Sequence, residues 1–143
     1  MNTADIVKLL PHASRMVLLD DVLEHDADTI HCVARSHHAA DNPLREDGRL
    51  PAWCGLEYAA QAMAVHQRLC AGNAEAPARG FLALARELAL SRDLLDELPG
   101  ELHIHAEKVI AQGGHSLYDF RLSCDEQPVL SGRVAVVLQG AGE

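Results

Sequence analysis

One long helical pattern in the middle of the chain constrains the fold more than any other feature. Pro51 suits the first position of a helix, and Gly72-Asn73 ends the pattern after residue 71. Between these points apolar residues recur at roughly helical spacing: Leu56, Ala59, Ala60, Met63, Ala64 and Leu69. Because alanine lies on several faces, residues 51–71 are expected to pack closely against other backbone, as a helix wrapped by a sheet must.

The segments around this helix alternate in polarity or are partly β-branched, which is typical of strands. Thr3 is expected to cap a short helix that ends before Pro11, and Asp26-Ala27-Asp28 is a turn signal. Residues 81–90, FLALARELAL, have helix-favouring side chains and are ambiguous by themselves. The expected strands are residues 16–23, 29–35, 102–107, 117–124 and 129–138. A hairpin, a long helix and a run of antiparallel strands make an α+β pattern.

The composition excludes several classes of protein. With 143 residues, 48% of them hydrophobic, the chain is expected to form a single domain over residues 1–143. No apolar run reaches the roughly 18 residues that cross a membrane, and the first residues do not resemble a secretory signal, so a cytoplasmic location is expected. A net charge of −9 and an aromatic content of 3% argue against nucleic-acid binding, which uses basic patches and stacking aromatics.

The cysteines and histidines do not predict a metal site. The four cysteines lack C-x-x-C spacing and are expected to be reduced, small apolar residues. His103 and His105 share one face of an expected strand, a spacing that can bind zinc, but the sequence offers no evident third ligand. We therefore expect neither a metal nor another cofactor.

The start of the long helix carries a family signature. The segment GRLPAWCGLEYAAQ, residues 48–61, resembles the hotdog β-hydroxyacyl-acyl-carrier-protein dehydratases, in which a loop leads into a central helix whose first turns carry Glu or Asp. Glu57 and Gln61 match the Glu and Gln of that family. The amino end, LLPHASRMVLLDDVLEHD, is also similar, and residues 50–58 resemble the dehydratase-like proteins of aryl polyene pigment gene clusters. The resemblance implies a hotdog fold, in which an antiparallel sheet wraps around one long central helix, and a strand in the first half of residues 81–90.

The chain departs from this family at the residue that acts as the base. The dehydratases carry a catalytic His in Gly-His-Phe-Pro, and the corresponding place before the acid falls on Pro43 in this chain. No His stands between residues 39 and 56. His37 and His38, at the end of an expected strand, are the nearest imidazoles and are the candidates for the base.

The chemistry of a dehydratase site predicts what the residues at the start of the long helix do. Removing water from a 3-hydroxyacyl thioester requires a base for the C2 proton, an acid for the leaving hydroxyl and donors for the thioester oxygen. The first N–H groups of a helix are such donors, so the backbone of Cys54, Gly55 and Leu56 is expected to bind the substrate. Gly55 is also expected to let the acyl group approach closely. Glu57 is the expected acid, and Gln61, four residues on, is expected to orient it.

Three functions fit these residues. The first is a cofactor-free dehydratase acting on 3-hydroxyacyl thioesters, and the second is an acyl thioesterase in which Glu57 activates water. The third is a half-site or binding-only subunit of a heterodimeric dehydratase, since the acid is present and the family His is missing. The resemblance implies a site at a dimer interface, so a homodimer or a heterodimer with a related hotdog subunit is expected. An acidic acyl carrier protein would dock on a local cluster such as Arg86, Arg92 and Lys108.

Overall fold

The structure is a computed structural model in which residues 6, 17–71, 79–112 and 115–139 are described. The expected helix over residues 3–10 and the helix stop at Gly72-Asn73 lie outside these ranges, apart from the buried, helical Ile6. The described elements are β1 (Asp21–His25), β2 (Thr29–Ala34), the 3₁₀ turns η2 (Ser36–His38) and η3 (Ala52–Cys54), α2 (Gly55–Ala71), β3 (Arg79–Leu90), β4 (Leu102–Gln112), β5 (His115–Cys124) and β6 (Gln127–Gln139).

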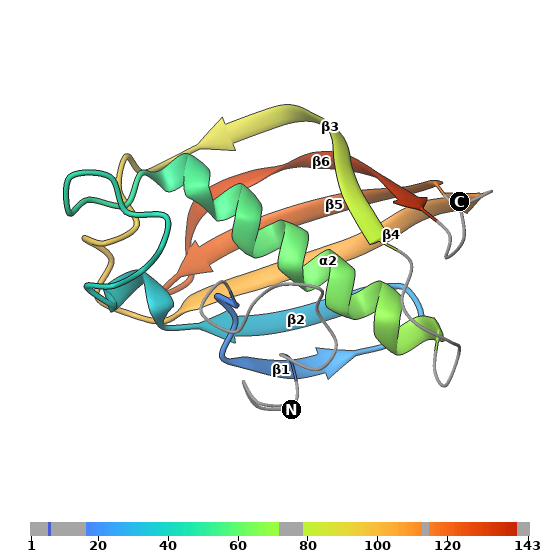
Figure 1. The fold of residues 1–143 in the computed structure, drawn as a ribbon, viewed down its shortest axis with the longest axis horizontal. Helices are drawn as coiled ribbons and strands as arrows, with labels where there is room; N and C mark the ends of the chain where they lie inside the picture. The colour runs from blue at the N-terminus through green and yellow to red at the C-terminus, as the bar shows by residue number, and fades with distance from the viewer. Residues whose placement is uncertain (1–5, 7–16, 72–78, 113–114, 140–143) are drawn as a thin grey trace.

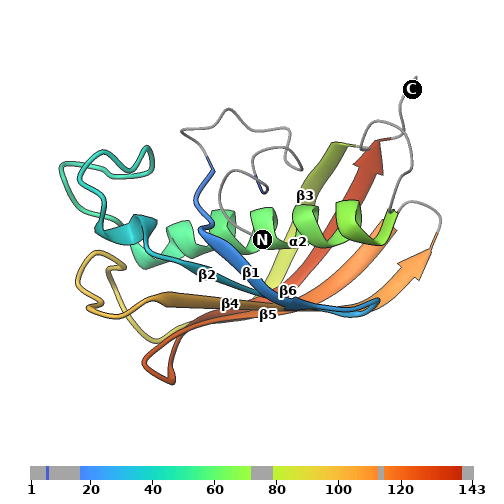
Figure 2. The same cartoon turned by 90° about the horizontal axis from the view of Figure 1, so that it is seen from below.

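The strands form one antiparallel sheet that curves around α2. Their order across the sheet is β1-β2-β4-β5-β6-β3, with the two edges formed by β1 and β3 (Figure 1). Figure 2 shows α2 lying along one face of the sheet, with the far ends of the strands rising beside it. This arrangement confirms the predicted α+β architecture of a sheet wrapped around one long helix. Among the described helices, none combines the length and the apolar character needed to cross a membrane.

Alternating side chains of the sheet form the core beneath α2. The buried residues on this face of the central strands are Ile30, Cys32, Ile104, Ala106, Tyr118, Phe120 and Leu122. On the helix, Ala59 and Ala62 have no exposed surface. Small side chains at these positions let the helix lie close to the strands, which is the packing that the alanine-rich pattern predicts.

Several element boundaries differ from the sequence prediction: β4, β5 and β6 run longer than expected, and two further differences concern the first strand and the long helix. The strand expected over residues 16–23 is displaced, because β1 spans Asp21–His25 and residues 17–20 are not in a strand. The Leu18 N–H donates to the side chain of Gln61 instead of to a neighbouring strand. The helix expected from Pro51 begins four residues later, because the 3₁₀ turn η3 precedes it.

The segment FLALARELAL is a strand along its whole length, in spite of its helix-favouring side chains. Pairing with β6 runs from Arg79 opposite Gln139 to Leu90 opposite Leu130, with two register shifts. Hydrogen bonds to β6 therefore outweigh the local propensity, whose differences are well under about 1 kcal/mol per residue. The expectation from the family resemblance, a strand in the first half, is confirmed and extends to the second half.

Gly55 lies where the start of α2 meets the sheet. A Cβ atom added there would be 2.8 Å from Leu122 Cδ2 and 2.9 Å from Leu130 Cδ2, closer than real Cβ contacts. The missing side chain therefore serves the contact between helix and sheet. The sequence-based interpretation, in which Gly55 lets an acyl group approach closely, stays a prediction.

We predict that Gly55→Val destabilises the protein by about 1–3 kcal/mol, the usual cost of overpacking a core. The valine methyl groups would displace Leu122 and Leu130 from their positions on β5 and β6. Urea unfolding measures the change. Ala60→Val, at a partly exposed position of the same helix, controls for the β-branched side chain in a helix. Equal stability of the two variants would contradict the prediction.

Candidate active site

A cleft opens where the loop after β2 meets the start of α2. Its volume is about 400 Å³. The residues that line it are Pro43, Leu44, Arg45 and Glu46 from the loop, and Trp53, Cys54, Leu56 and Glu57 from η3 and the first turn of α2. Three of the predicted site residues, Cys54, Leu56 and Glu57, therefore line one cleft whose walls are mainly apolar and carry two carboxyl groups.

Gln61 connects Glu57 to the segment that leads into β1. Its Nε2 donates to Glu57 Oε1 at 3.4 Å across one turn of the helix, the contact that the spacing predicts. Its Oε1 accepts the Leu18 N–H at 2.8 Å, and the side chain has no exposed surface. Because a backbone N–H can only donate, the bond to Leu18 fixes which end of the amide is the oxygen. The donor end of Gln61 must therefore face Glu57.

The amides at the helix start are used differently from the prediction. The turn η3 closes short-range backbone bonds, as 3₁₀ segments at helix starts do. Cys54 N–H donates to the Pro51 carbonyl at 3.0 Å, and Gly55 N–H donates to the Ala52 carbonyl. The Cys54 and Gly55 amides are therefore used within the turn in this structure, and their binding of a substrate stays a prediction. Of the three predicted amides, Leu56 is the leading candidate for that role.

A buried hydrogen-bond network that the sequence analysis missed fixes the loop to the helix. Tyr58 OH lies 2.8 Å from Ser36 Oγ and accepts Asn42 Nδ2 at 3.2 Å. The same Asn42 amide donates to the Ser36 carbonyl, and its Oδ1 accepts the Leu44 N–H at 2.9 Å. Burial raises the pKa of Tyr58. The loop wall of the cleft is thus attached to the residue next to Glu57.

The Arg45 side chain holds the loop after β2 together by bonding to three of its backbone carbonyls. Its Nε donates to the Ala39 carbonyl at 2.8 Å, and its two terminal nitrogens donate to the Gly48 and His37 carbonyls. Although Arg45 lines the cleft, its guanidinium is satisfied by backbone oxygens of its own loop. The cleft therefore has a structural arginine in its wall.

The His37 and His38 side chains are not part of the cleft lining in this chain; both rings bond to the loop between β3 and β4. His37 Nε2 lies 2.9 Å from the Gly100 carbonyl, and His38 Nε2 lies 2.6 Å from the Leu98 carbonyl. The two rings are 3.9 Å apart, and His37 is fully buried. Burial and the neighbouring His38 lower the pKa of His37. These contacts are those of imidazoles that hold two loops together.

Other histidines lie in two separate places. His66 is fully buried on α2, with Nδ1 2.7 Å from Tyr118 OH and Nε2 2.8 Å from the Asp26 carbonyl. On the opposite face of the sheet, His31 joins the predicted pair: its Nε2 lies 2.8 Å from His103 Nδ1, and its ring stacks on His105 at 3.9 Å.

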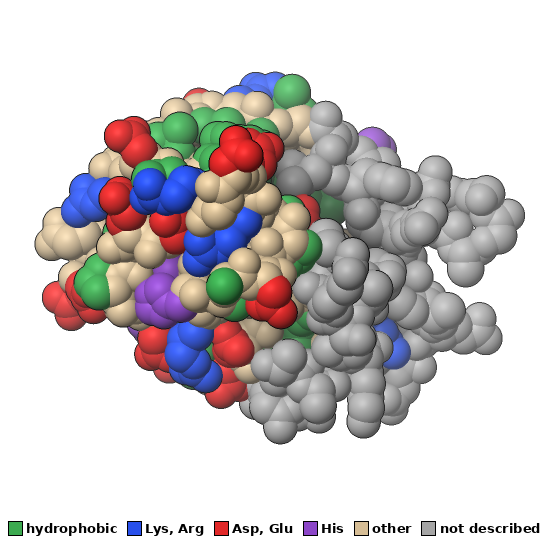
Figure 3. Space-filling model, turned by 60° about the vertical axis from the view of Figure 1, so that its left-hand side comes forward, with side chains coloured by type: hydrophobic (Ala, Val, Ile, Leu, Met, Phe, Trp, Pro, Cys, Tyr) green, Lys and Arg blue, Asp and Glu red, His purple; other side chains and the backbone are tan. Residues whose placement is uncertain are grey.

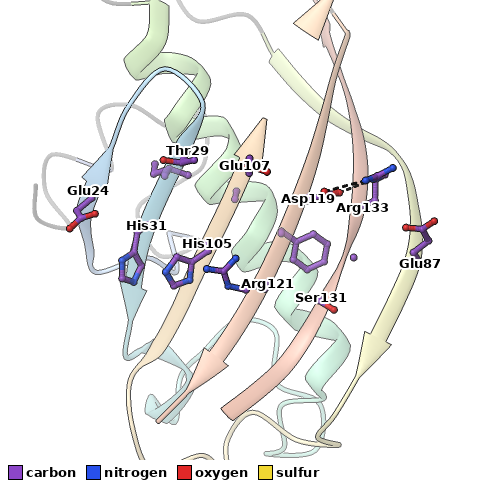
Figure 4. A pocket seen from close by; sticks show the side chains of 14 residues that line it. Glu24, Thr29, His31, Glu87, His105, Glu107, Asp119, Arg121, Ser131 and Arg133 are labelled. Atoms are coloured by element: carbon purple, nitrogen blue, oxygen red, sulfur yellow. Dashed lines mark hydrogen bonds and ion pairs between the residues drawn. The ribbon is translucent and has the colours of Figure 1, made fainter. Parts of the chain in front are cut away.

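A groove of about 630 Å³ includes part of this outer face. In Figure 4, His31, His105 and Arg121 lie side by side on β2, β4 and β5, and Asp119 bonds to Arg133 farther along. No group of three His, Cys, Asp or Glu residues is arranged to hold a metal ion within the described ranges. This part of the outer face therefore carries a row of polar side chains that crosses neighbouring strands.

Two of the cations expected to form one docking cluster lie on strands that are not neighbours in the sheet. Arg86 is on β3 and Lys108 is on β4, and these strands are separated by β5 and β6, which corresponds to roughly 14 Å between strand axes. Near the cleft, Arg49 is paired with Asp96 and Glu97. Figure 3 shows acidic and basic side chains interspersed at this end of the molecule. Arg86 and Lys108 are therefore not on neighbouring strands, and the docking of a carrier protein on Arg86, Arg92 and Lys108 stays a prediction.

Comparison with solved structures defines the class of protein. The fold is similar to the dehydratase heterocomplex ApeI:P of Xenorhabdus doucetiae, with a TM-score of 0.85 and 23% identity over 96% of this chain and 93% of that chain. It is also similar to a thioesterase from Pseudomonas aeruginosa (TM-score 0.63, 13% identity, 97% and 94% covered). The PaaI protein of Escherichia coli gives a TM-score of 0.63 at 12% identity, with 94% and 88% covered. The fold is the hotdog fold of these proteins, as the resemblance implied.

A match to a family model shows the family to which the chain belongs. The model of the ApeP-like family, described as ApeP dehydratase, matches residues 4–140, and the chain belongs to this family. A search of curated proteins found no match. The family match confirms the resemblance to hotdog dehydratases that residues 48–61 and the amino end indicated.

The buried histidines predict loss of stability in mild acid. Burial lowers the pKa of His66 and His37, and burial beside His31 lowers the pKa of His105 to about 4. Below the unfolded value of about 6.5, the unfolded chain binds protons that the folded protein does not. Stability is therefore complete above about pH 6.5 and falls as the pH decreases from there toward the folded pKa values.

Urea unfolding between pH 7.5 and 5 measures this dependence. We expect the free energy of unfolding to fall in that range and the slope to be smaller in His66→Gln, which removes one buried titrating group. His115→Gln, at an exposed position of β5, is the matched control. A wild-type free energy that is constant over this range would refute the prediction.

Proposed function

We propose that this chain supplies the acid half of a 3-hydroxyacyl thioester dehydratase site, and that a related hotdog subunit supplies the base. The proposed substrate is carried on acyl carrier protein in aryl polyene or related fatty-acid or polyketide biosynthesis. The observation that carries the proposal is the position of Glu57 in the cleft wall with Gln61 donating to it, while His37 and His38 bond to the loop between β3 and β4.

The proposed reaction divides its proton transfers between two subunits. A base of the partner subunit removes the C2 proton of the substrate, and the electron pair forms the C2–C3 double bond as the C3–O bond breaks. Glu57, in its acid form, gives its proton to the departing hydroxyl, which leaves as water. The Leu56 amide is the candidate donor to the thioester oxygen, where negative charge develops. Gln61 holds the Glu57 carboxyl in place throughout.

Two observations support a base from another subunit. Pro43, at the place where the family carries its catalytic His, lines the cleft and has no titratable group. The similar ApeI:P structure is a dehydratase heterocomplex. In the alternative, in which His37 or His38 reaches the partner's cleft, the buried His37 ring could keep its Nε2 bond to Gly100 and would have to expose Nδ1, which has no partner among the described residues.

The edge strand β3 is the proposed surface for the second subunit. Among the described strands it pairs only with β6, and it is longer than the other edge strand, β1. Leu84, Leu88 and Leu90 are each about half exposed along it. An unpaired edge with exposed leucines favours association, because a second strand satisfies its backbone groups and covers the apolar side chains.

We predict that Glu57→Gln lowers the dehydration rate of the reconstituted complex by at least about a hundredfold, the usual contribution of a general acid. The substitution keeps the shape of the side chain and removes its ionisable proton. Turnover of a 3-hydroxyacyl carrier substrate measures the effect, and release of free thiol in the same samples reports the thioesterase alternative. Glu107→Gln, on β4 away from the cleft lining, is the control. Unchanged turnover in folded Glu57→Gln would remove Glu57 from the site.

A second prediction separates the half-site from a complete homodimeric site. The purified chain alone is expected to be inactive and to gain activity when a related hotdog subunit that carries the Gly-His-Phe-Pro motif is added. Sedimentation of each sample reports whether the chain is a monomer or dimer. Strong activity of the chain alone that disappears in the His37→Ala/His38→Ala variant would overturn the half-site in favour of a homodimer. Activity of the chain alone that survives this change would exclude both versions.

A further inference from the structure

We propose that Trp53 binds the acyl chain of the substrate and makes the site prefer planar, conjugated chains over saturated ones. This inference rests on the proposed function of the Glu57 cleft. It assigns to Trp53 a specificity role that the sequence did not indicate, since a core or subunit-contact residue is the simpler interpretation of a lone tryptophan.

The exposure of Trp53 is unusual for this molecule. The side chain is 55% exposed, whereas its neighbours in η3, Ala52 and Cys54, are 2% and 6% exposed. Trp53 is the single tryptophan of the chain, and the aromatic side chains whose burial is described elsewhere, Tyr58, Tyr118 and Phe120, are buried. Leaving a large apolar ring in water is unfavourable, so a ligand or a partner that covers it gains free energy.

The position of Trp53 relative to Glu57 indicates which part of a ligand would cover it. Both residues line the same cleft, four positions apart in the sequence. A substrate whose C3 hydroxyl lies at Glu57 must extend its remaining atoms along the other lining residues. Leu44 and Leu56 are partly buried there and pack against the core. The cleft lining therefore combines the Glu57 carboxyl group, apolar side chains and the indole of Trp53.

The chemistry of this wall fits an acyl chain better than the carrier arm. A pantetheine arm brings two amides and a phosphate, which require hydrogen-bond partners and cations. Arg45, the arginine that lines the cleft, already donates to the Ala39, Gly48 and His37 carbonyls. Glu46, which also lines it, would repel a phosphate. The acyl chain is therefore the occupant that we assign to the apolar part of the cleft.

An indole face distinguishes planar chains from saturated ones. Stacked π-systems gain a contribution beyond their buried area, which corresponds to about a two- to tenfold change in affinity. The cleft volume of about 400 Å³ is within the usual range of small-molecule sites, about 300–1,000 Å³. The loop wall of the cleft is held by the Tyr58, Ser36 and Asn42 network, so the position of that wall is defined.

The first experiment uses the fluorescence of the single tryptophan. The full chain is titrated with two pantetheine thioesters of equal carbon number, 5-phenylpenta-2,4-dienoyl and undecanoyl. We expect both to change the Trp53 emission at saturation and the conjugated probe to bind about two- to tenfold more tightly. Equal affinities, or no response to either probe, would contradict the proposal. This titration does not depend on turnover, so it is independent of whether Glu57 is the acid.

The second experiment uses the reconstituted complex and the ratio of kcat/KM for two substrates, 3-hydroxy-5-phenylpent-4-enoyl-pantetheine and 3-hydroxyundecanoyl-pantetheine. Trp53→Leu should abolish the preference for the first, mainly through KM, and Trp53→Phe should restore most of it. Ile110→Ala is the matched control, because Ile110 is also 55% exposed but lies on β4 away from the cleft lining. An unchanged ratio in Trp53→Leu would overturn the proposal.

A further arm distinguishes the acyl chain from a subunit contact. One result would place Trp53 in the subunit interface and contradict the proposal. In that result the partner subunit shifts the Trp53 emission and removes its response to the probes, and Trp53→Leu binds the partner more weakly. If Glu57→Gln retains full turnover while the Trp53 variants still change the substrate ratio, the proposed acid is wrong and the specificity role remains. The two proposals can therefore fail separately.

Discussion

The close contact between α2 and the sheet is the constraint on which the rest of the structure depends. Ala59 and Ala62 are fully buried, and Gly55 has no room for even one more carbon against Leu122 and Leu130. Because the helix lies this close, its first turn is held over β5 and β6, and Glu57 is left in the wall shared with the loop after β2. A change that lifted the helix start from the strands would move the acid and its cleft together.

The elements that the sequence predicts well are those whose hydrophobic pattern and tertiary role agree. The long helix and strands β2, β4, β5 and β6 all carry the period expected of them. The β3 segment is the exception, because Leu and Ala favour a helix locally and only pairing with β6 decides otherwise. The family resemblance predicted that strand where residue propensities could not. Residues 17–20 were misassigned because Leu18 bonds to a side chain instead of a strand.

In the candidate site, too, local contacts could be predicted from the sequence, whereas contacts between distant segments could not. The bond between Gln61 and Glu57 is predictable, since residues four apart on a helix face each other. The hydrogen bonds of the Cys54 and Gly55 amides were not predictable in this way, because they depend on the type of turn before the helix. The Asn42–Tyr58 bond and the meeting of His31 with His103 require the tertiary fold and the strand register, neither of which can be read from spacing alone.

The two-sided bonding of Gln61 also links the charge of the acid to the stability of a distant backbone segment. Its oxygen is held by the Leu18 N–H, and its amino group faces Glu57, so the carboxamide cannot rotate while that segment is closed. If opening at Leu18 releases Gln61 and so changes how tightly Glu57 binds a ligand, binding of that ligand changes the free energy of the opening by the same amount, because such coupling is reciprocal. Hydrogen exchange at the Leu18 amide is in this sense a backbone reporter of events at the carboxyl group.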